Sequence, residues 1–137
     1  MPDEKDYIDD TNIPSDSVLW RRIPPWHYRY DENVGDKRPS TASFEDDMDG
    51  APMSAYLAEE CREPEVALEG HEGFGLVAFT AGFARELGLK IVRQTVPGPP
   101  GHVVIVGKKT DSIRKKLKKK SEWVRRPSED SGEAASG

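Results

Sequence analysis

The chain has 137 residues and a formal net charge of −5, with 25 acidic against 20 basic side chains. A chain of this length forms one domain, because it is too short to bury two separate hydrophobic cores. No apolar run reaches the about 18 residues of a membrane span, and the acidic start lacks the apolar stretch of a secretory signal. The single cysteine, Cys61, cannot form a disulfide within the chain. We therefore expect a cytoplasmic protein with no membrane contact.

The charge is distributed unevenly along the chain. Residues 1–16 hold six acids and one lysine, and residues 127–137 hold three acids and no base. Neither segment has an apolar periodicity that could offset the entropy of ordering, so we predict two disordered acidic tails. Residues 17–126, the predicted single α+β domain, carry a formal charge of +3. The acidity of the whole chain thus belongs to its two ends.

The first predicted element is a strand over residues 17–23, a β-favouring run that stops at Pro24 and Pro25. Residues 24–52 are rich in Pro, Gly, Asp and Ser. Because long unstructured connections are uncommon in compact domains, we expect part of this region to form a short strand or an ordered loop.

Residues 52–60 favour a strand, because Met53, Ala55 and Leu57 alternate with serine and tyrosine; a helix is the close alternative. The following residues, 61–73, predict a loop. This segment contains Gly and Pro and shows no periodicity.

The strongest local pattern predicts a helix near residues 75–87. Phe79, Phe83 and Leu87 recur at intervals of four, which places them on one helical stripe. A glycine inside a helix costs about 1 kcal/mol relative to alanine. We therefore expect Gly82 to mark a close packing contact.

The second half of the chain continues with alternating elements. Gly88 is placed to end the first helix in a left-handed conformation. Residues 89–94 predict a strand, residues 102–106 a buried strand, and residues 111–124 a closing helix. These elements and the early strands predict an α+β fold with a small mixed or antiparallel sheet and two helices.

The stretch from Pro99 to Thr110 superficially resembles a phosphate-binding loop. That loop needs four residues between its first glycine and the Gly-Lys pair, whereas Gly101 and Gly107 are separated by five. The intervening residues are mostly β-branched and favour an extended backbone, which cannot wrap an anion. We predict instead a core strand that ends at Gly107, followed by a helix capped by Thr110 or Ser112.

No metal site or cofactor is predicted. Residues 45–50 resemble the start of a calcium loop, but the first position is Glu45 and the twelfth is Tyr56, so an acidic turn is the better interpretation. The short paired spacing of structural zinc sites is missing from the remaining candidate ligands: His27, His71, His102 and Cys61.

A partial resemblance suggests an enzyme as the alternative function. Arg22 on the first strand, followed by Ser-Thr-Ala-Ser at residues 40–43, resembles the first two elements of the ADP-ribosyltransferase fold. The third element, a Glu-x-Glu or Gln-x-Glu pair on a strand, has no counterpart in the sequence. The resemblance implies a small transferase-like enzyme with Arg22 and Ser40 in its site.

The same residues also have structural interpretations. One arginine of the pair Arg21–Arg22 would lie along the sheet edge and pair with Asp46 or Asp47. His102 is the third catalytic candidate, but it begins an apolar strand, where a hydrogen-bonded structural histidine is the commoner role.

A broader resemblance rests on the segments LWRRIPP, RPSTASFEDD, MSAYLAEE, FTAGFARELGL and GHVVIVGKKT. Together they resemble a family of small uncharacterised bacterial proteins of unknown function over residues 18–126. The resemblance implies no activity.

The segment 108–126 holds half of the basic residues of the chain and only two acids. On the predicted helix Ile113, Leu117 and Val124 share one side, which Lys120 interrupts, so the helix is modestly amphipathic and the lysines can spread outwards. The sequence therefore predicts a binding or accessory protein, not an enzyme, that contacts a polyanion. The candidate binding residues are Lys108, Lys109, Arg114, Lys115, Lys116, Lys118, Lys119, Lys120, Arg125 and Arg126.

The predicted partner is a nucleic acid or an acidic protein, and the sequence does not indicate an oligomeric state. Trp123 is the one aromatic residue of this segment, so base stacking is not favoured. A solvated helix that only maintains solubility is the structural alternative. The acidic residues 1–16 could also fold back over the helix and screen it.

Overall fold

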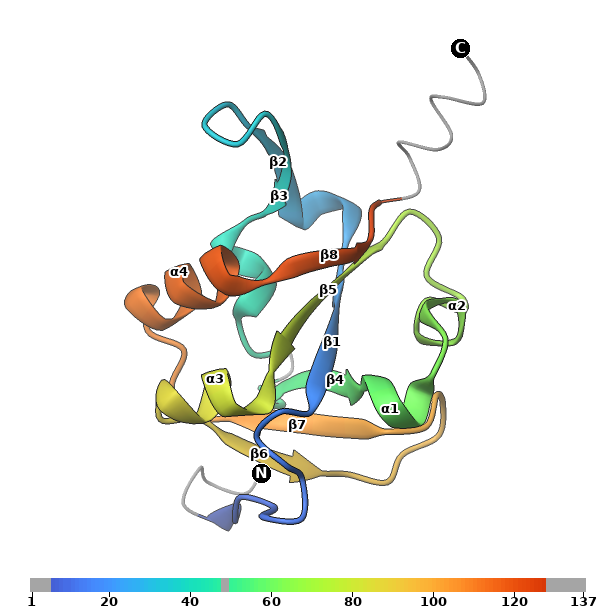
Figure 1. The fold of residues 1–137 in the computed structure, drawn as a ribbon, viewed down its shortest axis with the longest axis vertical. Helices are drawn as coiled ribbons and strands as arrows, with labels where there is room; N and C mark the ends of the chain where they lie inside the picture. The colour runs from blue at the N-terminus through green and yellow to red at the C-terminus, as the bar shows by residue number, and fades with distance from the viewer. Residues whose placement is uncertain (1–5, 48–49, 128–137) are drawn as a thin grey trace.

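The computed structural model describes residues 6–47 and 50–127 and has an α+β fold (Figure 1). Its centre is a six-stranded sheet in which every neighbouring pair is antiparallel. In spatial order the strands are β6 (Lys90–Arg93), β7 (His102–Val106), β4 (Met53–Leu57), β1 (Val18–Ile23), β5 (Gly75–Thr80) and β8 (Glu122–Arg125). A separate hairpin consists of β2 (Tyr28–Asp31) and β3 (Asp36–Pro39).

Short helices cover both sides of the central strands. In Figure 1, α3 and α4 lie on one side of β1 and β5, and α1 and α2 lie on the other. The described residues contain four α-helices where two were expected, and two of the four are a single turn long. The helices are α1 (Ala58–Cys61), α2 (Pro64–Ala67), α3 (Ala81–Glu86) and α4 (Asp111–Lys120), with 3₁₀ helices η2 (Pro25–His27) and η3 (Thr41–Phe44).

The sheet buries apolar side chains on both faces. The larger cluster includes Leu19, Val77 and Ile105, and the segment before β1 contributes Ile13 to it. The smaller cluster, on the opposite face, includes Trp20 and Tyr56 and is packed by α1 and α2. Side chains of a strand alternate between faces, so successive residues of the interior strands enter different clusters.

The predicted strands at residues 17–23, 89–94 and 102–106 are confirmed as β1, β6 and β7. The strand favoured at 52–60 is confirmed over Met53–Leu57, where β4 lies between β7 and β1. The expected order within residues 24–52 is confirmed by the β2–β3 hairpin and the 3₁₀ helices.

The helix predicted over residues 75–87 is wrong in its first half, which forms β5. Leu76, Val77 and Phe79 are all buried, because both faces of this interior strand are covered. An apolar run buried on two faces loses the alternation typical of a strand and can imitate a helical stripe. The helix α3 starts only after Thr80, whose hydroxyl oxygen accepts a hydrogen bond from the backbone N–H of Phe83.

Two expectations about the glycines of α3 are confirmed. A Cβ atom on Gly82 would lie 2.8 Å from the carbonyl oxygen of Ser15, so this glycine permits a close backbone approach. Gly88 has φ +86° and ends the helix in the left-handed conformation. The N–H of Leu89 then donates to the carbonyl of Ala84, which completes the helix ending.

The closing helix predicted over residues 111–124 is also shorter than expected. The helix α4 ends at Lys120, and Trp123 and Val124 belong to β8, which pairs with β5 at the edge of the sheet. The Arg38 guanidinium of the hairpin donates to the carbonyls of Lys118 and Ser121, at 2.8 and 2.7 Å. These bonds satisfy carbonyl groups that the helix end leaves without partners.

The predicted N-terminal tail is wrong for the part that the structure describes. Ile13 is 1% exposed in the main core, and the Asp10 N–H donates to the carbonyl of Ile91 on the edge strand β6. The Asp9 carboxylate accepts from the Ile91 N–H and from Arg85. Residues 6–16 therefore cover β6 and α3 instead of folding over α4. Residues 1–5 and 128–137 lie outside the described residues.

Within 6–47 and 50–127, no helix combines the length and the apolar character that crossing a bilayer requires.

Candidate functional site

The first catalytic candidate, Arg22, is held by structural contacts. Its Nε donates to the carbonyl of Ala67 on α2 at 2.6 Å, and its Cζ lies 4.7 Å from the ring centroid of Tyr56. The guanidinium therefore fastens α2 to the sheet. β1 is an interior strand, so the expectation that an arginine of this pair lies along the sheet edge is wrong.

The segment 40–43 meets Arg21 instead of Arg22. The Arg21 Nε donates to the carbonyl of Ser43 at 3.0 Å, and the Ser43 hydroxyl donates to the carbonyl of His27. Consecutive residues of β1 point to opposite faces, so Arg22 lies across the sheet from this segment. The structure therefore does not bring Arg22 and Ser40 together in one site.

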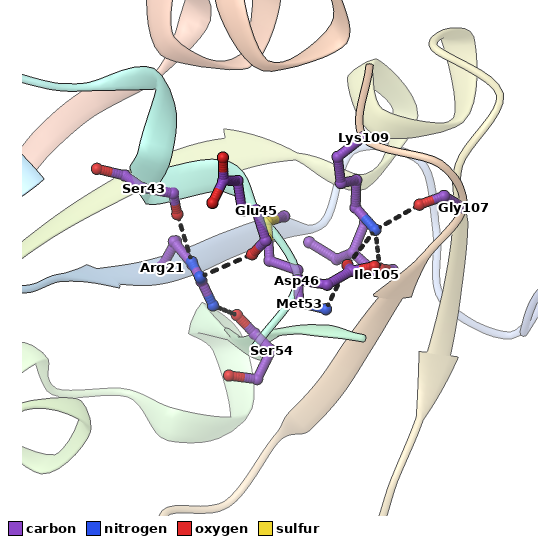
Figure 2. A network of polar contacts seen from close by, with 9 residues as sticks. All are labelled: Arg21, Ser43, Glu45, Asp46, Met53, Ser54, Ile105, Gly107 and Lys109. Atoms are coloured by element: carbon purple, nitrogen blue, oxygen red, sulfur yellow. Dashed lines mark hydrogen bonds and ion pairs between the residues drawn. The ribbon is translucent and has the colours of Figure 1, made fainter. Parts of the chain in front are cut away.

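Arg21 is bound mainly by backbone carbonyls, not by the carboxylates that were expected to pair with it. Its guanidinium also donates to the carbonyls of Ser54, at 2.8 Å, and Glu45, at 3.4 Å (Figure 2). Burial lowers the pKa of Arg21, while the nearby Asp47 and Asp46 charges raise it. The side chain thus fastens η3 to β4, and its donors face the protein.

The third candidate, His102, lies beside Tyr56 on the neighbouring strand β7. Its ring meets the Tyr56 ring edge-to-face, with centroids 5.3 Å apart. Burial lowers the pKa of His102, although a hydrogen bond with the Gln94 backbone acts in the opposite direction. The Nδ1 atom is buried and has no hydrogen-bond partner. A neutral imidazole packed on an aromatic ring agrees with a structural role.

Cys61 adds no reactive group to this region. The residue is buried, and burial raises the pKa of its thiol, although the charge of Arg22 lowers it. A thiol with a raised pKa holds little of the nucleophilic thiolate at neutral pH. Among the described residues, no cluster of His, Cys, Asp or Glu could hold a metal ion.

The candidate binding residues divide into bound and exposed cations, and Lys109 is the clearest bound one. Its side chain is only 4% exposed. As Figure 2 shows, its Nζ donates to the carbonyls of Ile105 and Gly107, at 2.8 and 2.7 Å, and to the Asp46 carboxylate at 2.7 Å. An ammonium group has three donors, so these contacts saturate it. Lys109 therefore does not belong to an exposed binding surface.

Four more of the predicted binding residues form ion pairs within the molecule. Arg114 reaches Glu45 at 2.5 Å, and Lys115 reaches Asp111 at 2.9 Å. The other two pairs are Arg125 with Glu65 and Arg126 with Asp36. These pairs are partly solvated, so they reduce the positive potential without abolishing it.

The remaining lysines of α4 form a distinct surface. We call Lys116, Lys118, Lys119 and Lys120 the lysine face; none of them forms an ion pair with any described residue. Three of the four are exposed, and Lys118 is partly exposed. Lys108, also exposed and without an ion pair to the described part of the chain, lies just ahead of the helix.

The packing of α4 turns the lysine face outwards. Leu117 is fully buried, and Ile113 packs beside it against the main core. The Thr110 hydroxyl accepts from the Ile113 N–H at 3.2 Å and caps the first turn, as the sequence predicts. Lys116, Lys118 and Lys119 point away from the side that carries Ile113 and Leu117, whereas Lys120 lies next to that side at the exposed end of the helix.

This arrangement places like charges side by side. Lys116 and Lys120 are one helical turn apart, as are Lys115 and Lys119, and each pair costs a few tenths of a kcal/mol. Part of that cost is offset because cations near a helix C-terminus interact favourably with the macrodipole.

Comparison of the chain with protein families, with curated proteins and with solved structures gives no match. The resemblances drawn from the sequence therefore stay predictions.

Sequence reasoning missed the residue that fixes the C-terminal end of the lysine face. Arg38 lies in a Pro- and Asp-rich connection and is 80 residues from Lys118, whose carbonyl it binds. No local pattern marks such a contact. The pairing of β2 with β3 places the arginine beside the last turn of α4, and pairing between distant segments is a tertiary property.

Proposed function

We propose that the protein is a non-catalytic binding or accessory protein whose lysine face contacts a phosphate-rich polyanion, with nucleic acid as the favoured class. The observation that carries this proposal is the absence of ion pairs at Lys116, Lys118, Lys119 and Lys120 within the described residues, while most neighbouring bases are paired. The four cations lie on one helix and have no ion-pair partner among the described residues, so phosphates can replace their counterions.

The geometry supports a phosphate backbone over a discrete anion. Lysine ammonium groups are point charges on flexible stems and bind phosphates without a fixed geometry. Lys116 lies one helical turn from Lys119 and from Lys120, with Cβ atoms about 5–6 Å apart, which suits neighbouring charges of a phosphate backbone. The competing structural interpretation, a helix that lysines only keep soluble, predicts no such binding.

The test is fluorescence anisotropy with labelled single-stranded and duplex DNA of mixed sequence, titrated at several salt concentrations. Wild-type protein is expected to bind both, with an affinity that falls as salt rises. Lys119→Glu is expected to weaken binding about 5-fold or more at low salt and to reduce the salt dependence by about one phosphate contact.

Arg62→Glu is the matched control, because Arg62 follows α1 on the other side of the sheet and the substitution changes the net charge equally. Equal weakening by both substitutions would assign the binding to overall charge and contradict the lysine face. Failure of wild-type protein to bind either DNA at low salt would overturn the nucleic-acid proposal. Binding to polyglutamate alone would point to an acidic protein partner.

A further inference from the structure

A groove of about 570 Å³ lies beside the C-terminal end of the lysine face. It runs between α3, the segment before β1, and the end of α4. Its main lining side chains are Ser15, Thr80, Phe83, Arg85, Glu86 and Lys120. Lys120 belongs to both the groove and the lysine face, so the two features are continuous.

Most polar groups of the groove are already engaged. The Arg85 guanidinium donates to the Asp9 carboxylate, the Ser15 hydroxyl and the Asp10 carbonyl. The Thr80 hydroxyl caps α3. Lys120 and Glu86 are the two charged lining residues without a hydrogen bond or ion pair to any described part of the chain. The groove therefore offers one cation and one carboxylate to a ligand.

Phe83 gives the groove an aromatic surface. The ring is partly buried and packs against the main core, which holds it in place. The Lys120 Nζ lies 5.7 Å from the ring centroid, on the ring face. The ring and the lysine are 37 positions apart in the sequence, so only the fold brings the aromatic surface to the basic helix.

We propose that this groove receives one base of a single-stranded nucleic acid. The base stacks on Phe83, Lys120 binds the adjoining phosphate, and neighbouring phosphates follow the lysine face. This inference rests on the proposed polyanion binding and specifies its substrate class. Base–aromatic stacking is stronger than an exposed cation–π contact, so a base can displace the ammonium from the ring and leave it for the phosphate.

Two features favour a base over an acidic peptide. The Glu86 carboxylate can accept a hydrogen bond from the amino group of a base, but it repels an acidic side chain. Carboxylate side chains also lack the flat aromatic face that would stack on Phe83.

The test compares two labelled single strands of equal length: a mixed-sequence oligonucleotide and an abasic oligonucleotide with the same phosphates. Wild-type protein is expected to bind the base-containing strand about 5-fold or more tightly, measured by anisotropy at low salt. Phe83→Leu, which keeps an apolar side chain at the core, is expected to remove this preference and leave abasic binding unchanged. The matched control is Tyr30→Leu, which removes an exposed aromatic side chain on β2. This variant should keep the preference for the base-containing strand.

Each outcome separates the two proposals. Equal wild-type binding of the two strands overturns the base groove but leaves polyanion binding standing. Binding of neither strand overturns both. A wild-type preference that survives in Phe83→Leu, or is lost equally in Tyr30→Leu, places the base contact elsewhere. The wild-type comparison needs no substitution, so it decides the inference even where Phe83→Leu does not fold.

Discussion

Lys109 and Lys119 lie ten positions apart in the same basic segment, yet the fold gives them opposite roles. Lys109 is 4% exposed and donates to two carbonyls and a carboxylate. Lys119 is exposed on α4 and has no ion pair with a described residue. The first is a structural cation and the second is available to a partner.

The difference comes from the acceptors that surround each ammonium group. Lys109 follows the end of β7, where the carbonyls of Ile105 and Gly107 and the carboxylate of Asp46 converge, so two segments supply three oxygen atoms (Figure 2). The solvent side of a helix offers few backbone acceptors, because the carbonyls ahead of its last turn are engaged within the helix, and Arg38 occupies the Lys118 carbonyl in the last turn of α4. A lysine there pairs only where an acid stands one turn away, as Asp111 does for Lys115.

The most damaging change to the structural cations should be Arg21→Met. It keeps the apolar stem and leaves the carbonyls of Ser43, Ser54 and Glu45 without their donor. Such unsatisfied groups cost about 3 kcal/mol of unfolding free energy together. Urea denaturation monitored by tryptophan fluorescence measures the unfolding free energy of both proteins. A loss below about 1 kcal/mol in Arg21→Met would contradict the structural role of Arg21.

Lys109→Met should cost slightly less, about 2 kcal/mol, because Asp46 is partly solvated and can recover water. Binding of DNA by the folded fraction should stay unchanged, since the ammonium group is not exposed. The distinction between buried structural cations and exposed binding cations is wrong if Lys109→Met weakens DNA binding as strongly as Lys119→Glu does.

The pH dependence of the thermal stability tests the role of a third group, His102. Burial lowers the pKa of His102 in the folded state, so protonation favours unfolding. Its contribution to stability is present above the unfolded pKa, near 6.5, and is lost as pH falls towards the folded pKa. The thermal midpoint should therefore decrease from pH 7.5 to pH 5.5.

The thermal midpoint of the His102→Phe variant should decrease less than that of wild type between pH 7.5 and pH 5.5, as measured by calorimetry on both proteins. Part of the decrease should remain, because burial also lowers the pKa of His27. Identical pH profiles for the two proteins would show that His102 does not titrate as its surroundings indicate.

The smallest expected effect is that of Lys119→Ala on stability. Removing a like charge one turn from Lys115 should leave the unfolding free energy within about 0.5 kcal/mol of wild type or raise it slightly. The same variant should bind DNA more weakly. A loss above 1 kcal/mol in urea denaturation would show that Lys119 has a structural partner.

Prediction from the sequence succeeded where local patterns decide. The strands 17–23, 89–94 and 102–106 have β-favouring runs limited by proline or glycine, and each forms where expected. The Thr110 cap and the left-handed Gly88 likewise follow from short-range backbone chemistry.

Prediction failed where a distant segment determines the environment. Residues 75–80 form a strand because β1 and β8 flank them, and Val124 leaves the predicted helical stripe because β5 offers a free edge. The catalytic candidates Arg22 and Ser40 are separated because the segment 40–43 packs on the face of β1 that carries Arg21. Adjacent residues of a strand face opposite sides, so Arg22 points away from that segment.

The sequence alone determined the α+β class, the positions of β1, β4, β6 and β7, and the concentration of basic residues between 108 and 126, because these depend on composition and short-range periodicity. Only the tertiary structure decided which cations are bound, that Ile13 joins the core, and that Phe83 lies beside Lys120. Hydrogen-bond acceptors and aromatic neighbours come from segments tens of residues away, and local sequence cannot specify their approach.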